Sequence, residues 1–154
     1  MNKINRRIYK MKKSLMILVA IIAIPLSSYA GIKGFVKATD GGEWSSILIR
    51  EDLTFDKAFN EVLDICAKRF EMDMISKEGG YGRTNWCYTW NIKGKYVSTY
   101  RVRVIFKFSA DRTKVDIKTE AEFLKGNNWV KGFDTRLLET MKKDIGGVVS
   151  RTVL

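Results

Sequence analysis

Histidine is absent from this sequence. The absence excludes nucleophilic sites that use imidazole as a base, and it removes the commonest nitrogen ligand for metals. The two cysteines are too few for a structural zinc site. The segment Gly80-Tyr81-Gly82 lacks the third glycine of a dinucleotide loop and the lysine of a phosphate loop. We therefore identify no catalytic, metal-binding or cofactor-binding residue from the sequence.

Proline is nearly absent as well, since Pro25 is the one proline of the chain. Residues 1–30 begin with a basic region, continue with an apolar run over 15–26 and end in small residues at Ser28 and Ala30. This pattern predicts a secretory signal peptide cleaved after Ala30. The run is shorter than the ~20 apolar residues that span a bilayer. A retained N-terminal membrane anchor is the alternative.

The signal peptide changes the charge of the chain. Residues 1–30 hold six of the 28 basic residues and none of the 17 acidic ones, which leaves 22 basic residues and a net charge of +5 for residues 31–154. A charge of this size suits solubility or weak attraction to anionic surfaces better than dedicated nucleic-acid binding. We expect an exported bacterial protein, periplasmic or secreted, with no transmembrane span in its mature chain and one domain.

The central feature of the mature chain is a hairpin over residues 99–123. In 100–108 the even positions are apolar, and in 113–123 the odd positions are mostly apolar, which is the period of half-buried strands. With Asp111-Arg112 as the turn, Tyr100 faces Phe123 on the apolar side. On the polar side, basic residues face acidic ones, and the predicted pairs are Lys107 with Asp116, Arg103 with Glu120 and Arg101 with Glu122. We therefore favour paired charges over a basic stripe that grips nucleic acid.

Helices and further strands surround the hairpin. Helical spacing of apolar residues predicts helices over 54–70, with Thr54 as N-cap, and over 133–149. Short strands are predicted over 44–50, 72–76 and 83–92, and a loop over 124–129. Glycines in 31–43 indicate a flexible leader before a single domain over 44–154. The prediction is an α+β two-layer sandwich: an antiparallel sheet of about five strands with two helices on one face.

This order of elements resembles small bacterial envelope domains of the BamC-like or TBP-like kind. The resemblance covers most of residues 46–149 and includes a strand ending near Glu78-Gly79-Gly80 and the strand around Val102. It contains no catalytic motif. The lipoprotein cysteine common in such proteins is missing here. The resemblance implies a non-enzymatic domain of the cell envelope.

Cys66 and Cys87 could form a disulfide in an oxidising compartment. The alternative is two small thiols in the core. If Cys87 faces inward, then Trp86, Tyr88 and Trp90 form an exposed aromatic surface; if these aromatics face inward, Cys87 cannot reach Cys66. We favour inward aromatics, because bulky aromatic side chains usually belong to the core.

Trp129 is the last residue of the predicted loop 124–129. Lys125 lies within the same loop, and Lys131 follows two residues after it. A tryptophan there either covers one end of the core or, beside lysines, contacts a sugar, a peptide or an anionic lipid. The candidate binding surface comprises Trp86, Tyr88, Trp90, Arg101, Arg103, Lys125, Trp129 and Lys131.

The functional hypothesis is an exported binding or envelope-assembly module without enzymatic activity, whose partner is an envelope protein, a glycan or a lipid. Two alternative hypotheses assign the chain to other functional classes of protein. One is a carrier of a small apolar ligand, and the other is a hydrolase that uses carboxylates in the cleft between helices and sheet.

Overall fold

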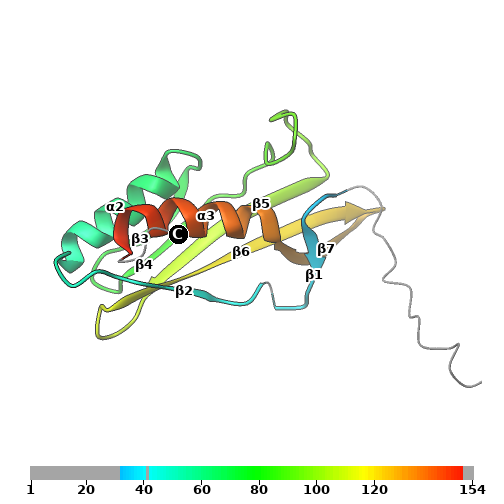
Figure 1. The fold of residues 1–154 in the computed structure, drawn as a ribbon. Coiled ribbons are helices and arrows are strands. Elements are labelled where there is room, and N and C mark those ends of the chain that lie inside the picture. Colours follow the sequence, from blue (N-terminus) through cyan, green and yellow to red (C-terminus); the bar gives the residue numbers. More distant parts are fainter. Residues whose placement is uncertain (1–31, 41, 151–154) are drawn as a thin grey trace, which may run out of the picture. The chain divides into compact units, whose positions relative to one another are not determined.

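The computed structural model describes residues 32–40 and 42–150 of the chain (Figure 1). From Lys33 onward these residues belong to one compact unit, in which helices pack on an antiparallel sheet of seven strands. The predicted α+β class is confirmed, but the sheet is larger than the five strands expected. The predicted signal peptide and its cleavage after Ala30 lie outside the described residues. Within those residues, no helix has the length and apolar character needed to cross a membrane.

The sheet has the order β1-β7-β6-β5-β4-β3, and β2 also pairs with β6. All of the pairings are antiparallel. β6 is the longest strand, and on one edge it pairs with β2 along its first half and with β7 along its second. The strands are β1 (Phe35–Lys37), β2 (Ser45–Leu48), β3 (Met72–Ser76), β4 (Tyr81–Thr84), β5 (Tyr100–Phe108), β6 (Lys114–Lys125) and β7 (Asn128–Asp134).

The central hairpin has the predicted register. Tyr100 lies opposite Phe123, Arg101 opposite Glu122, and Lys107 opposite Asp116. The even-numbered side chains of β5 are buried, while Arg101 and Arg103 alternate with them on the other face. A slip of one residue would expose the whole apolar set, so burial of this face fixes the register.

Both helices cover the face that carries the even-numbered residues of β5 (Figure 1). α2 (Phe55–Ala67) begins at the predicted N-cap, because the Thr54 hydroxyl accepts a hydrogen bond from the Lys57 N–H. The N-cap of α3 (Thr135–Val149) is Asp134, whose carboxylate accepts from the Leu137 N–H. Side chains between helices and sheet are almost wholly buried, among them Phe59, Val62, Val104, Phe106, Phe108, Ile117, Leu137, Met141 and Ile145.

The leader predicted over 31–43 is partly wrong, because it contains β1. Phe35 packs edge-on against Phe123, with ring centroids 5.0 Å apart, and also contacts Tyr100. Gly132 of β7 allows this approach, since a Cβ at that position would lie 2.1 Å from the Val36 carbonyl oxygen. The folded domain therefore begins before residue 44.

The strand predicted over 83–92 is shorter than expected. β4 ends at Thr84, whose hydroxyl accepts the hydrogen bond of the Val104 N–H at 3.0 Å in place of a backbone carbonyl. Arg83 lies opposite Ile105, but Cys87 lies opposite Val102, so the segment from Arg83 to Cys87 contains one residue more than its partner. Such a bulge moves every later side chain to the other face of the sheet.

The loop predicted over 124–129 is instead the turn of a second hairpin. β6 continues to Lys125, which pairs with Asn128 of β7, and Gly126-Asn127 form the turn between them. Gly126 has a φ of 62°, which suits the first central position of a tight hairpin turn. As a result, Phe133 belongs to β7, and the second helix starts at Thr135 rather than at 133.

Candidate functional site

The face of the sheet that α2 and α3 leave uncovered is called the open face here. It carries the outward side chains of β5 and β6, which include Arg101, Arg103, Glu120 and Glu122. Trp129 and Lys131 of β7 share this face, because they lie opposite Leu124 and Glu122. The bulge after β4 adds Trp86 to it. Aromatic and charged side chains from several segments are thus brought together on one surface.

Arg101 is the centre of the open face. Its guanidinium lies 4.5 Å from the ring centroid of Trp86 and 4.3 Å from that of Trp129. It donates two hydrogen bonds to Glu122 Oε2, at 2.9 and 2.6 Å, and a third to the Tyr88 hydroxyl at 3.2 Å. A planar guanidinium can stack on aromatic rings and direct several N–H donors at neighbouring oxygens at the same time, which the ammonium group of lysine cannot do. This arginine therefore fixes two tryptophans in place.

Arg103 extends the same arrangement along β5. Its guanidinium lies 4.4 Å from the Trp86 ring and donates from Nε to Glu120 Oε2 at 2.6 Å. Lys118 makes a second ion pair with Glu120, at 3.2 Å, and lies over the ring of Trp44. The side chains of Arg103 and Glu120 are 22% and 20% exposed, so this pair is only partly screened by water. The charges of the open face are largely balanced within the molecule.

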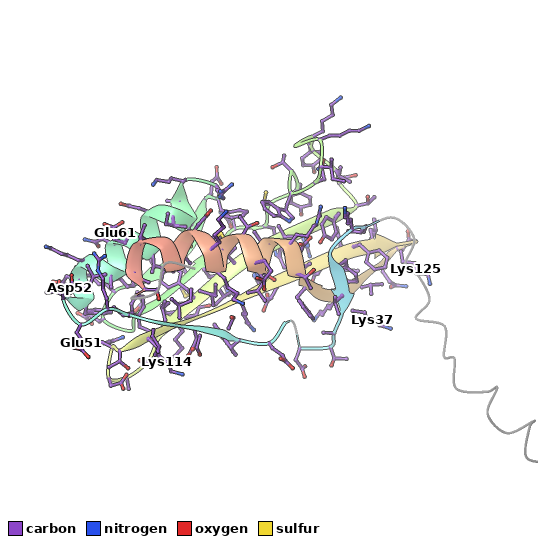
Figure 2. The ribbon with its side chains drawn as sticks, viewed as in Figure 1. Lys37, Glu51, Asp52, Glu61, Lys114 and Lys125 are labelled. Carbon is purple, nitrogen blue, oxygen red and sulfur yellow. The ribbon has the colours of Figure 1, made fainter. Side chains whose placement is uncertain are left out.

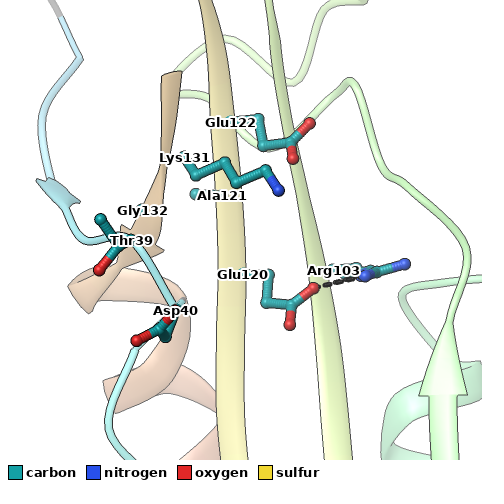
Figure 3. Close-up of a pocket in the computed structure, with 8 residues that line it drawn as sticks. All are labelled: Thr39, Asp40, Arg103, Glu120, Ala121, Glu122, Lys131 and Gly132. Carbon is teal, nitrogen blue, oxygen red and sulfur yellow. Dashed lines mark hydrogen bonds and ion pairs between the residues drawn. The ribbon is translucent and has the colours of Figure 1, made fainter. Parts of the chain in front are cut away.

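A shallow hollow of about 240 Å³ lies beside this network, between β5, β6, β7 and the segment after β1 (Figure 3). Its polar lining comes from Thr39, Asp40, Arg103, Glu120 and Glu122, together with Lys131. Lys131 reaches across β6 in Figure 3 and is exposed. The hollow therefore offers donors and acceptors next to the rings of the open face.

The carboxyl group of Glu120 has a shifted pKa. Burial raises that pKa, but the hydrogen bond and positive charge of Arg103, with those of Lys118, outweigh burial and hold it below the ordinary value. Because the unfolded chain takes up the proton more readily, this pair stabilises the fold above the unfolded pKa of ~4.3. The stabilisation is lost as the pH falls through the lower pKa of the folded state.

Glu120→Gln is therefore expected to lower the free energy of unfolding by about 2 kcal/mol at pH 7, and by progressively less as the pH falls through the lowered pKa of the folded state. Urea unfolding at several pH values measures the difference between the two chains. Glu61→Gln, at an exposed position of α2, is the matched control and should follow the wild-type curve at each pH. A Glu120→Gln variant whose free energy of unfolding differs from that of wild type by the same amount at every pH would contradict the role of this pair.

The open face unites most of the predicted surface: Trp86, Tyr88, Arg101, Arg103, Trp129 and Lys131. The inward orientation that we favoured for the aromatics is wrong for Trp86 and Tyr88, because of the bulge. Trp90 lies elsewhere, beside Phe70 with ring centroids 6.4 Å apart. Lys125 is exposed at the turn of the second hairpin. The interpretation that Arg101 and Arg103 are paired with carboxylates is confirmed.

Both cysteines are free thiols in this structure. Cys87 lies opposite the buried Val102 and therefore faces the helices, while Cys66 is buried on α2. Burial raises the pKa of the Cys66 thiol to about 12, so this sulfur stays protonated at neutral pH. Cys66 is thus a core side chain, whereas Cys87 is only partly buried and its sulfur lies 3.3 Å from the Thr89 hydroxyl.

Sequence reasoning missed the parts that Glu120, Glu122, Lys118 and Trp44 play on the open face. The hairpin register already placed the two glutamates opposite the arginines, but it gave no sign that tryptophans stack on the same guanidinium groups. Within residues 32–40 and 42–150, no group of three or more Cys, Asp or Glu side chains is placed to hold a metal ion.

Comparison with known proteins adds no assignment. No protein-family model matches the chain, and no curated protein matches it in sequence.

Proposed function

We propose that residues 31–154 form a non-enzymatic binding module of the bacterial cell envelope, exported to the periplasm or secreted, whose open face receives a partner protein. The observation that carries the proposal is the stack of Trp86, Arg101 and Trp129 on the uncovered side of the sheet. Tryptophan, tyrosine and arginine are the residues that dominate the energy of protein interfaces. A glycan or a lipid is the alternative partner.

The rigidity of the stack supports the proposal. Arg101 is held by Glu122 and Tyr88 in addition to the two rings, so its guanidinium and the adjacent indoles are ordered before any partner arrives. A surface ordered in advance binds with a smaller loss of side-chain entropy. The neighbouring hollow and the exposed amine of Lys131 supply polar groups at the rim of the stack.

The experiment is affinity capture of tagged residues 31–154 from envelope extract of the native host. Trp129→Ala and Lys131→Glu alter the open face, whereas Lys143→Glu makes the same charge change at an exposed position of α3. One partner enriched by wild type and Lys143→Glu, but lost with both open-face variants at unchanged Tm, is the expected result. Equal capture by all four chains would overturn the proposal, as would loss that merely follows a lower Tm.

The resemblance to BamC-like or TBP-like domains belongs to the same proposal and rests on the order of elements. The apolar-ligand carrier and the carboxylate hydrolase are kept as hypotheses. A ligand that co-purifies with residues 31–154 in native mass spectrometry would favour the carrier, and turnover in a substrate screen would favour the hydrolase.

A further inference from the structure

The loop between β4 and β5, residues 85–99, contains an exposed apolar tip. It rises away from the sheet at the top of Figure 1. At the tip, Ile92 is 81% exposed and Tyr96 is 68% exposed, and both are among the most exposed large side chains described. Exposure of this kind on one projecting tip requires an explanation, because water disfavours large apolar surface.

Hydrogen bonds within the loop hold the tip in one shape. Asn91 binds on three sides: its side-chain amide donates to the Lys95 carbonyl at 2.5 Å, its side-chain oxygen accepts from the Lys93 N–H at 3.0 Å, and its carbonyl accepts from the Gly94 N–H at 3.0 Å. The Tyr96 ring stacks on Tyr88, with centroids 5.4 Å apart. The side chains at the tip are therefore presented by an ordered turn.

The tip is also basic. Lys93 and Lys95 are exposed on either side of Gly94, and residues 85–99, which form the loop, contain no acidic residue. The base of the loop adjoins the second hairpin, since the Leu124 N–H donates to the Thr99 carbonyl at 2.8 Å. Residues 123–133 of that hairpin again include no acid and two lysines. The exposed lysines Lys93, Lys95 and Lys125 therefore lie at the same end of the domain.

The opposite end of the domain is acidic. Residues 51–78, which include α2 and β3, contain eight acidic and four basic residues. In Figure 2, Glu51, Asp52 and Glu61 lie at the left end together with Lys114, whereas Lys37 and Lys125 lie at the right end. The domain therefore has a charge polarity that would turn the loop toward an anionic surface and the acidic end away from it.

We infer that the tip of loop 85–99 is a contact site for a bilayer with anionic headgroups. Ile92 enters the acyl boundary, the Tyr96 ring lies at headgroup level, and Lys93 and Lys95 pair with the headgroups. A protein partner fits less well, because lysine is depleted at protein interfaces. The inference does not depend on the open face, which lies along the strands rather than at the tip.

The test uses residues 31–154, which contain the compact unit and lack the apolar run 15–26. Binding is measured by cosedimentation with vesicles of phosphatidylglycerol and phosphatidylcholine, and with vesicles of phosphatidylcholine alone. Lys93→Gln with Lys95→Gln removes the charges, and Ile92→Ser removes the apolar tip. The matched controls are Lys57→Gln with Lys68→Gln on and just after α2, and Leu48→Ser, at a position that is 65% exposed.

Wild type is expected to bind the anionic vesicles and not phosphatidylcholine alone. Loss of both lysines should weaken that binding about 30-fold, and loss of the isoleucine about tenfold, with both controls unchanged. Absence of wild-type binding, equal loss in the controls, or equal binding to both vesicles would overturn the inference. The inference would also be overturned if wild type formed a dimer that the loop variants dissociate, because the tip would then contact a second copy of the chain. Trp129→Ala should keep vesicle binding, so failure of the open-face proposal would be seen separately.

Discussion

Replacing Phe59 with alanine is expected to lower the free energy of unfolding by about 4 kcal/mol. Phe59 is 1% exposed, and its ring centroid lies 5.7 Å from that of Phe106 and 5.8 Å from that of Phe108. This one side chain therefore joins α2 to two positions of the central strand. Its removal loses the transfer energy of a phenyl ring and leaves a cavity that the packed neighbours fill only in part. Urea unfolding followed by circular dichroism gives the value.

Two further variants test whether the loss of stability comes from the burial of Phe59. Leu48→Ala removes a comparable apolar side chain at a position that is 65% exposed, and it should change the free energy of unfolding by less than about 0.5 kcal/mol. Phe59→Leu retains most of the buried volume and should recover part of the loss. A Phe59→Ala variant as stable as Leu48→Ala would mean that α2 does not pack on β5 as described.

Replacing Asp134 with alanine is expected to lower the free energy of unfolding by about 3 kcal/mol. The Asp134 side chain is fully buried and has three partners: it accepts from the Leu137 N–H at 2.9 Å as the N-cap of α3 and from the Tyr100 hydroxyl at 2.7 Å, and it lies 3.5 Å from the Arg136 guanidinium. Alanine removes the cap, which accounts for roughly 1–2 kcal/mol. It also leaves the tyrosine hydroxyl buried without its acceptor, which costs roughly 1–3 kcal/mol.

A double-mutant cycle separates the two contributions. Tyr100→Phe alone should cost about 1 kcal/mol, because it removes the hydroxyl that needs the acceptor. In a chain that already carries Tyr100→Phe, Asp134→Ala should lower the free energy of unfolding by less than it does alone, since no tyrosine hydroxyl is then left without an acceptor. Chemical denaturation of the four chains gives the coupling energy. Strict additivity would show that the hydroxyl and the carboxylate do not interact.

The sequence predicted best the part of the fold that rests on an uninterrupted period. β5 and β6 alternate apolar and charged residues over long runs, and a register that pairs Arg103 with Glu120 also pairs Tyr100 with Phe123. Two independent patterns therefore agreed on one alignment. The helical stripe through Phe59, Val62 and Cys66 is equally regular, and these residues are buried.

The parts that could not be predicted depend on single residues. Thr84 accepts a main-chain hydrogen bond through its side chain, and no periodic pattern reveals such a substitution. β1 is short, and its pairing depends on the bare backbone of Gly132. The turn at Gly126-Asn127 did carry a sequence signal, since glycine followed by asparagine between two β-like runs is typical of a hairpin.

Some members of the candidate site could be predicted from the sequence, but their arrangement could not. Arg101, Trp86 and Trp129 stood out in the sequence by residue type, and the register gave Arg101 its carboxylate. The stacking of both rings on one guanidinium follows from the bulge and from the second hairpin, which bring Trp86 and Trp129 to the same face. Both features join segments that a reading along the chain treats separately.

The bulge after β4 also bears on how related chains should be compared. It places Trp86 on the open face and Cys87 toward the helices, so the surface chemistry depends on the number of residues between Arg83 and Cys87 as much as on their identity. A relative that lacks one residue between Arg83 and Trp86 would still contain the Trp-Cys pair, but it would present the thiol where this chain presents the indole. A gap in this segment of an alignment therefore marks a relative with a different surface. A match without a gap indicates the same open face, which the overall sequence identity does not indicate.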